Sequence, residues 1–181
     1  ILKVNTIQDA TNSNTAMTID SSGNVKISGS VIQAVTSKYT QASNDVTFSA
    51  TSFADAETIN FTPKFSNSLI KHTFYAKTLM DSTNYNVGQE VRWLRDSTIL
   101  AGSSWSNYFN RADFSSDYYP FLVWHYVDEP NTTNQITYKF QGRSYGGNGS
   151  NYQWRCFRKH HSTDATYGDH GGQWTIEEIA Q

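Results

Sequence analysis

The chain has 181 residues, a formal net charge of −2, 17% charged residues and 14% aromatic residues. This length suits one sizeable domain with a short extension, and the near-neutral charge excludes an electrostatic basis for binding nucleic acid or an anionic membrane. We therefore expect no nucleic-acid partner and no membrane insertion. Cys156 is the single cysteine, which excludes an intrachain disulfide framework and a cysteine-based metal cage. We expect no cofactor.

Residues 1–35 differ in pattern from the rest of the chain. Met17 and Ile19 alternate with Thr18, a turn follows at Ser21–Asn24, and alternation resumes over Val25–Ile27. Because two strands are marginal in water, this hairpin needs a partner. We predict a β-stem or linker over 1–35 that joins the head domain, 36–181, to a larger body. An ordinary hairpin docked on the core is the alternative. The start at Ile1, without methionine, suggests a piece of a longer protein.

Short apolar stretches with strand-like alternation recur at regular spacing after Val35, and no 3.6-residue apolar stripe is found among them. Ile136, Tyr138 and Phe140 form the clearest alternation, entered from a corner at Glu129–Asn131. The expected strands are Val46–Ala50, Thr58–Thr62, Leu69–Lys77, Gln89–Leu94, Tyr119–Val127, Gln135–Gln141, Tyr152–Lys159 and Gln173–Ala180. This arrangement predicts an all-β fold, an antiparallel jelly-roll sandwich.

The stretch Phe121–Val127, FLVWHYV, is apolar at both alternating sets of positions. One set is expected to face the domain core. The other set then faces something else, and a neighbouring subunit is the economical choice.

Several segments, in order, resemble the C-terminal head domain of bacteriophage tail-fibre and other virion structural proteins of the marine and cyanophage type. Val4–Gly29 is similar to the repeated leader of that family. The matching head segments are Phe61–Ile70 (a strand entry), Leu94–Gly102 (a hairpin), Asp128–Thr133 with Thr137–Lys139 (a corner), and Thr175–Ala180 (the terminal strand). The resemblance implies a jelly-roll head like those of the complement and tumour-necrosis-factor proteins, assembled as a homotrimer. It also implies a place on the virion, in a tail or capsid appendage.

Two stretches have the composition of binding loops. Trp105–Tyr119 combines rings, carboxylates and amides, and Arg143–Tyr152 places glycines between tyrosines. Rings that stack on sugars beside groups that bond hydroxyls make a general recipe for glycan recognition. The candidate receptor-binding residues are Trp105, Asn107, Tyr108, Arg111, Asp113, Tyr118, Tyr145, Asn148 and Tyr152. Packing against the sandwich or a subunit interface is the alternative role for these rings.

Evidence for metal binding and catalysis is weaker. His160, His161 and His170 lie close in the sequence but lack a strict ligand spacing, so they are only weak metal candidates. No nucleophile-elbow, phosphate-loop or zinc-protease motif occurs. The predicted function is non-enzymatic adhesion to a host cell-surface glycan or protein. The alternatives are a purely structural capsid or baseplate fibre or decoration protein, a polysaccharide depolymerase tip and, more remotely, a secreted monomeric lectin.

Overall fold

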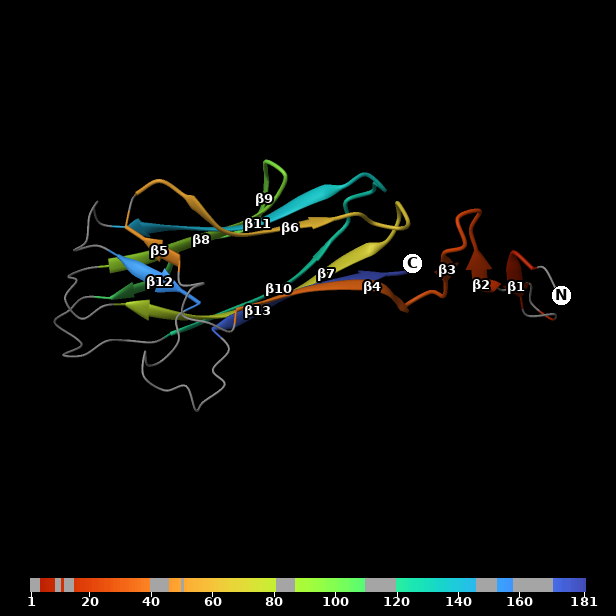
Figure 1. Cartoon of the computed structure of the whole chain (residues 1–181), viewed down its shortest axis with the longest axis horizontal. Coiled ribbons are helices and arrows are strands. Elements are labelled where there is room, and N and C mark those ends of the chain that lie inside the picture. The colour runs from red at the N-terminus through yellow and green to blue at the C-terminus, as the bar shows by residue number, and fades with distance from the viewer. Residues whose placement is uncertain are drawn as a thin grey trace.

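The computed structural model describes residues 4–8, 11, 15–39, 46–49, 51–80, 87–109, 120–145, 153–157 and 171–181. These residues form strands and turns, and none of them is helical. The strands are β1 (Thr6–Gln8), β2 (Thr15–Ile19), β3 (Val25–Lys26), β4 (Val31–Tyr39), β5 (Val46–Phe48), β6 (Ala54–Phe61), β7 (Leu69–Met80), β8 (Val87–Arg95), β9 (Thr98–Phe109), β10 (Phe121–Asp128), β11 (Ile136–Tyr145), β12 (Trp154–Cys156) and β13 (Gly172–Ile179). Figure 1 shows a two-layered head with a small separate sheet at its N-terminal end. The predicted all-β antiparallel fold is confirmed.

Two antiparallel sheets face each other in the head. β13 and β10 lie on opposite sides of β7, because both pair with the same β7 residues. The first sheet therefore has the order β4-β13-β7-β10, and β12 and β5 extend it beside the end of β7. The second sheet has the order β6-β11-β8-β9. Apart from the short strands β5 and β12, which both lie in the first sheet, the strands alternate between the two sheets along the chain except at the β8–β9 hairpin. This is the connectivity of a jelly roll.

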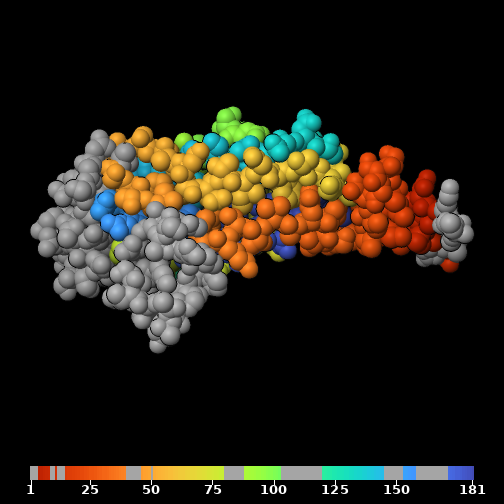
Figure 2. All heavy atoms as spheres, in the orientation of Figure 1, coloured from red at the N-terminus to blue at the C-terminus, as the bar shows by residue number. Residues whose placement is uncertain are grey.

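The stem is the three-stranded sheet of β1, β2 and β3. The predicted hairpin is present in it as β2 and β3, paired through Ile19 and Val25. Its turn is fixed by Asp20, whose carboxylate accepts hydrogen bonds from the backbone N–H of Ser22 and from Asn24. Figure 2 shows the stem as a narrow extension of the head.

The expected boundary between residues 35 and 36 falls inside β4. This strand pairs with β13 along its whole length, from Val31 to Tyr39. Before β4, the Gly29 N–H donates to the Ala180 carbonyl at 2.7 Å. The chain therefore joins the head's hydrogen-bonded sheet before residue 35.

The core is organised in rows across β7. Side chains of paired residues in an antiparallel sheet lie on the same face, so the inward residues of β7 align with those of β10 and β13. One row contains Trp174, Phe74 and Trp124. Phe74 and Trp174 are fully buried, with their ring centroids 6.1 Å apart. The second sheet contributes Phe140 to this cluster, 4.6 Å from Phe74.

Two turns predicted from the sequence, the corner at Glu129–Asn131 and the hairpin between β8 and β9, are present in the structure. In the predicted corner, Asn131 has a positive φ of 54° and its side chain donates to the Glu129 carbonyl at 3.0 Å. In the β8–β9 hairpin, Asp96 has a φ of 52° and accepts a hydrogen bond from the Thr137 N–H at 2.9 Å. Asparagine and aspartate tolerate this left-handed region better than other residues with a Cβ.

Candidate functional site

Most of the predicted receptor-binding and metal candidates lie outside the described residues. These are Arg111, Asp113, Tyr118, Asn148, Tyr152, His160, His161 and His170. The backbones of Trp105, Asn107, Tyr108 and Tyr145 are described, but their side chains are not.

The loop interpretation of the first part of Trp105–Tyr119 is wrong, because Trp105–Phe109 belongs to β9. Likewise, Arg143–Tyr145 ends β11 rather than beginning a loop. Both segments are strands because they form backbone hydrogen bonds with β8. The amino-acid composition of a short segment does not reveal such a distant partner. Gly88 of β8 pairs with both Tyr108 and Tyr145. Their backbones are therefore brought together at one end of the second sheet.

Strand β10 has one buried and one exposed side, and this asymmetry defines the candidate site. Leu122 and Asp128 are buried, whereas Phe121, Val123 and Val127 are 64%, 63% and 50% exposed. We call Phe121, Val123, His125 and Val127 the β10 outer face. The prediction that Phe121–Val127 presents one face to the core is confirmed. Within the described residues β10 has β7 as its sheet neighbour on one side and none on the other.

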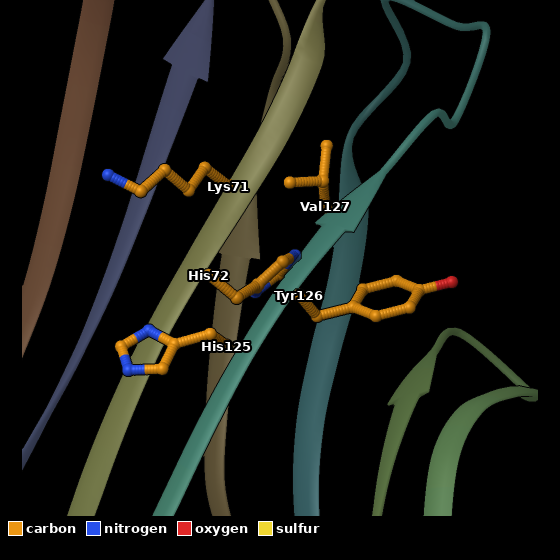
Figure 3. Close-up of a pocket in the computed structure, with 5 residues that line it drawn as sticks. All are labelled: Lys71, His72, His125, Tyr126 and Val127. Carbon is orange, nitrogen blue, oxygen red and sulfur yellow. The ribbon is translucent and has the colours of Figure 1, made fainter.

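An open pocket of about 400 Å³ lies over β7 and β10. It is lined by Lys71, His72, His125, Tyr126 and Val127. Figure 3 shows the side chains of Lys71 and His125 projecting to one side of the two strands and the Tyr126 ring to the other. Lys71 also forms an ion pair with Glu177 of β13 at 3.0 Å, so the cationic group of the pocket already has an acidic partner.

The outer face of the second sheet is different in character. The Phe53 ring lies against two guanidinium groups, 4.0 Å from that of Arg92 and 4.6 Å from that of Arg143. Arg143 forms an ion pair with Glu90. Arg92 donates to the Gln141 side chain at 2.6 Å, so the polar groups of this face have partners within the chain. The β10 outer face instead offers large apolar groups to the exterior.

On the inward side of β10, three aromatic rings form a ladder. The Trp93 and Trp124 rings stack with centroids 4.5 Å apart and planes 13° apart, and the Trp124 and Tyr126 rings lie 5.4 Å and 9° apart. Trp124 and Tyr126 remain half-buried, since β10 is the last described strand on this side of its sheet. The ladder connects the edge of the first sheet to β8 in the second.

His72 lies beneath this ladder and is fully buried. Neither ring nitrogen has a hydrogen-bond partner. The nearest rings are those of Tyr138 at 4.5 Å and Trp124 at 5.3 Å. Burial lowers the pKa of His72 to about 3, because removing the imidazolium from water disfavours the charged form.

One row further along β7, two buried carboxylates flank Ile70. Asp128 of β10 accepts from the Arg95 guanidinium at 2.7 Å and from the Tyr138 hydroxyl at 2.8 Å. Burial, followed by the bond to Asp128, raises the pKa of the Tyr138 hydroxyl. Glu178 of β13 accepts from the backbone N–H groups of Lys64 and Phe65, from the Ser68 hydroxyl and from the Gln33 side-chain amide. Both carboxylates are therefore fully engaged in holding the structure.

Sequence reasoning did not identify His72, Asp128 or Glu178 as buried polar groups. The alternation of β7 does contain the signal for His72, because it shares parity with the apolar Ile70 and Phe74. No group of three or more His, Cys, Asp or Glu side chains within the described ranges could hold a metal ion. The described part of the chain also holds no helix with the length and apolar character needed to cross a bilayer.

No protein-family model matches the chain, and no curated protein matches it by sequence. Solved structures of infectious bursal disease virus are similar in fold. The T13 viral particle matches with a TM-score of 0.51 and 14% identity over 86% of this chain. The VP2 subviral particle matches with a TM-score of 0.50 and 12% identity over 82% of this chain. This chain spans about a third of each of those chains, 33% and 32%. At such low identity the likeness concerns the fold: the chain has an all-β sandwich similar to one found in a viral particle.

Proposed function

We propose that this chain is a virion structural protein whose head assembles as a homotrimer and binds the host cell surface without catalysis. Two lines support a virion role. The sandwich is similar to that of a viral particle protein, and the ordered sequence segments resemble phage fibre heads. In this proposal the receptor is a glycan or protein, the stem joins the head to other virion proteins, and the location is a tail or capsid appendage.

The observation that carries the assembly is the β10 outer face. Phe121, Val123 and Val127 are at least half exposed in the single chain, and Tyr75 of β7 pairs with Val123 beside them. Clusters of large apolar side chains on a protein surface commonly mark an interaction site. Further copies of the chain are the partner we propose. Three copies would also strengthen weak contacts with a surface through avidity.

The buried carboxylates Asp128 and Glu178 do not supply the pair that the depolymerase alternative requires. Glycoside hydrolysis needs two carboxyl groups facing a groove. Asp128 and Glu178 instead lie inside the sandwich, bonded to Arg95, Tyr138 and the loop before β7. The depolymerase alternative predicts that reducing ends are released from host capsule or lipopolysaccharide, and we expect none.

Light scattering after size-exclusion chromatography tests the assembly. We expect the chain to have three times the mass of one copy, and Val123→Lys to have the mass of one copy, because a lysine ammonium would be buried in the contact. Thr58→Lys, an exposed position on the second sheet, is the matched control and should remain trimeric. A single-copy mass for the unmodified chain, or an unchanged mass for Val123→Lys, would refute this interface.

Binding of the labelled trimer to host cells tests adhesion. We expect saturable binding that weakens at least tenfold when Trp105 and Tyr108 are both replaced by alanine. Unchanged binding with an intact trimer would remove this pair from the receptor site. A trimer that binds no candidate host cell, envelope or purified glycan would favour the purely structural fibre or decoration role.

A further inference from the structure

We propose that His72 makes the junction of β7 with the edge strand β10 acid-sensitive, so that β10 is held at neutral pH and released as the solution becomes acidic. The proposal concerns the single chain and does not depend on the proposed function. It starts from position: His72 pairs with Tyr126 of β10 on one side and with Ile176 of β13 on the other.

The surroundings of His72 favour the neutral imidazole. The side chain is fully buried and both nitrogens lack a hydrogen-bond partner. Four rings enclose it: Trp124 and Tyr126 from β10, Tyr138 from β11 and Trp174 from β13. A protonated ring would carry two N–H donors without acceptors, in addition to an unsolvated charge.

Two opposing effects could favour the imidazolium, and neither compensates for this burial. Aromatic faces attract cations, but the rings offer no conventional acceptor to either N–H group. The nearest carboxylates, Asp128 of β10 and Glu178 of β13, are one row away. Asp128 is bonded to Arg95 and Tyr138, and Glu178 to the loop before β7. Tyr126 and Tyr138 are the other titratable groups around the ring, and both are neutral in the acidic range.

The direction of the pH effect follows from linkage. His72 has a pKa of about 3 in the folded protein and about 6.5 when unfolded. Between these values the unfolded chain binds more protons, so stability falls as the pH falls. From pH 7.5 to pH 5 this histidine alone lowers the folding equilibrium constant about 30-fold.

Strand β10 is the element expected to open first. It is bonded to β7 on one side and has no strand on its other side within the described residues. β13, by contrast, lies between β4 and β7. Water can therefore reach the His72 ring at the smallest cost by separation of β10, which carries two of the four enclosing rings. Because the β10 outer face lies on the same strand, its geometry changes with this opening.

Urea unfolding and hydrogen exchange between pH 7.5 and pH 5 test the proposal on the whole chain. Over this pH range we expect the folding equilibrium constant of the unmodified chain to fall about 30-fold more than that of His72→Phe, which keeps a ring but cannot be protonated. Exchange of 121–128, corrected for the intrinsic rate, should accelerate more than that of 172–179 in the unmodified chain but not in His72→Phe. His125→Gln, at an exposed position on the β10 outer face, should retain the unmodified pH dependence.

Equal pH dependence of the unmodified chain and His72→Phe would overturn the proposal, as would equal acceleration of β10 and β13. A direct measurement avoids dependence on the variant's folding. In a nuclear magnetic resonance titration of the unmodified chain, the His72 ring should remain neutral at pH 5 in molecules in which β10 stays paired with β7. An imidazolium signal for His72 at pH 5 with the β7–β10 hydrogen bonds intact would refute the proposal.

Discussion

The head and the stem differ in how far their apolar side chains are buried. In the head, Phe74, Phe140 and Trp174 are fully buried between two sheets. In the stem, cross-strand pairing places Ile7 opposite Met17 and Val25 opposite Ile19, on one face of a single sheet. Ile7 and Val25 are each 46% exposed.

The two regions therefore obtain their stability in different ways. A sandwich supplies its own second layer, whereas a short three-stranded sheet has only one layer and depends on a neighbour. We expect perturbations inside the head to reduce the free energy of unfolding strongly, and removal of the stem to affect the head little.

The largest expected effect is at Glu178. Its buried carboxylate accepts from the Lys64 and Phe65 N–H groups at 2.9 and 3.0 Å, from Ser68 at 2.7 Å and from Gln33 at 2.6 Å. Glu178→Ala leaves these donors without a partner and should reduce the free energy of unfolding by about 4 kcal/mol. Urea unfolding at pH 7.5 measures the loss.

The adjacent Glu177 is the control for this prediction. It is on the outer face of β13 and its ion pair with Lys71 is partly exposed. Glu177→Ala should change the free energy of unfolding by less than about 1 kcal/mol. Similar losses for the two variants would show that Glu178 does not hold the loop before β7.

Gly142 should give the second-largest effect. A Cβ at this position would lie 2.7 Å from the Trp154 ring and 2.9 Å from the Phe48 ring. Gly142→Ala should therefore cost about 2 kcal/mol through overpacking, measured by urea unfolding. Gly102→Ala is the control, because the nearest atom to its Cβ would be at 3.4 Å. An unaffected Gly142→Ala would mean that Trp154 moves at no cost.

Removal of one buried hydroxyl should give an intermediate effect. The Tyr138 hydroxyl donates to Asp128 at 2.8 Å and so links β11 to β10 across the sandwich. Tyr138→Phe should reduce the free energy of unfolding by about 1.5 kcal/mol. Thermal and urea unfolding should agree on this value, and Tyr75→Phe on the outer side of β7 provides the comparison. If both tyrosine variants behave alike, the inter-sheet bond contributes nothing measurable.

The smallest effect should come from deleting residues 1–28. Among the described residues, few side-chain contacts join the stem to the head: the Lys26 ammonium lies 3.2 Å from the Asn67 side-chain oxygen and 5.5 Å from the Phe65 ring centroid. Both are exposed contacts of modest strength. The isolated head should lose less than about 1 kcal/mol at low protein concentration, where assembly does not contribute. A loss of several kcal/mol would show that the stem is part of the head's folding unit.

The elements that local chemistry specifies could be predicted from the amino-acid sequence. The alternation of Ile136, Tyr138 and Phe140 predicts β11, and all three are buried. The corner at Glu129–Asn131 follows from turn residues, and the stem hairpin from its alternation. Each of these signals lies within a few adjacent residues, so no knowledge of distant partners was needed.

Other parts of the fold and the candidate site could not be predicted in this way, because they depend on pairing with residues that are distant in the chain. β4 is a strand because β13 pairs with it. β11 continues through Gly142 because this residue pairs with Val91 of β8, and the absence of a Cβ there leaves room for the Trp154 ring. The candidate site depends on the same kind of information. The strands that lie beside β10 and across the sandwich from it determine that the β10 outer face is exposed and that His72 is buried beneath the strand. Side-chain alternation alone does not specify these neighbouring strands.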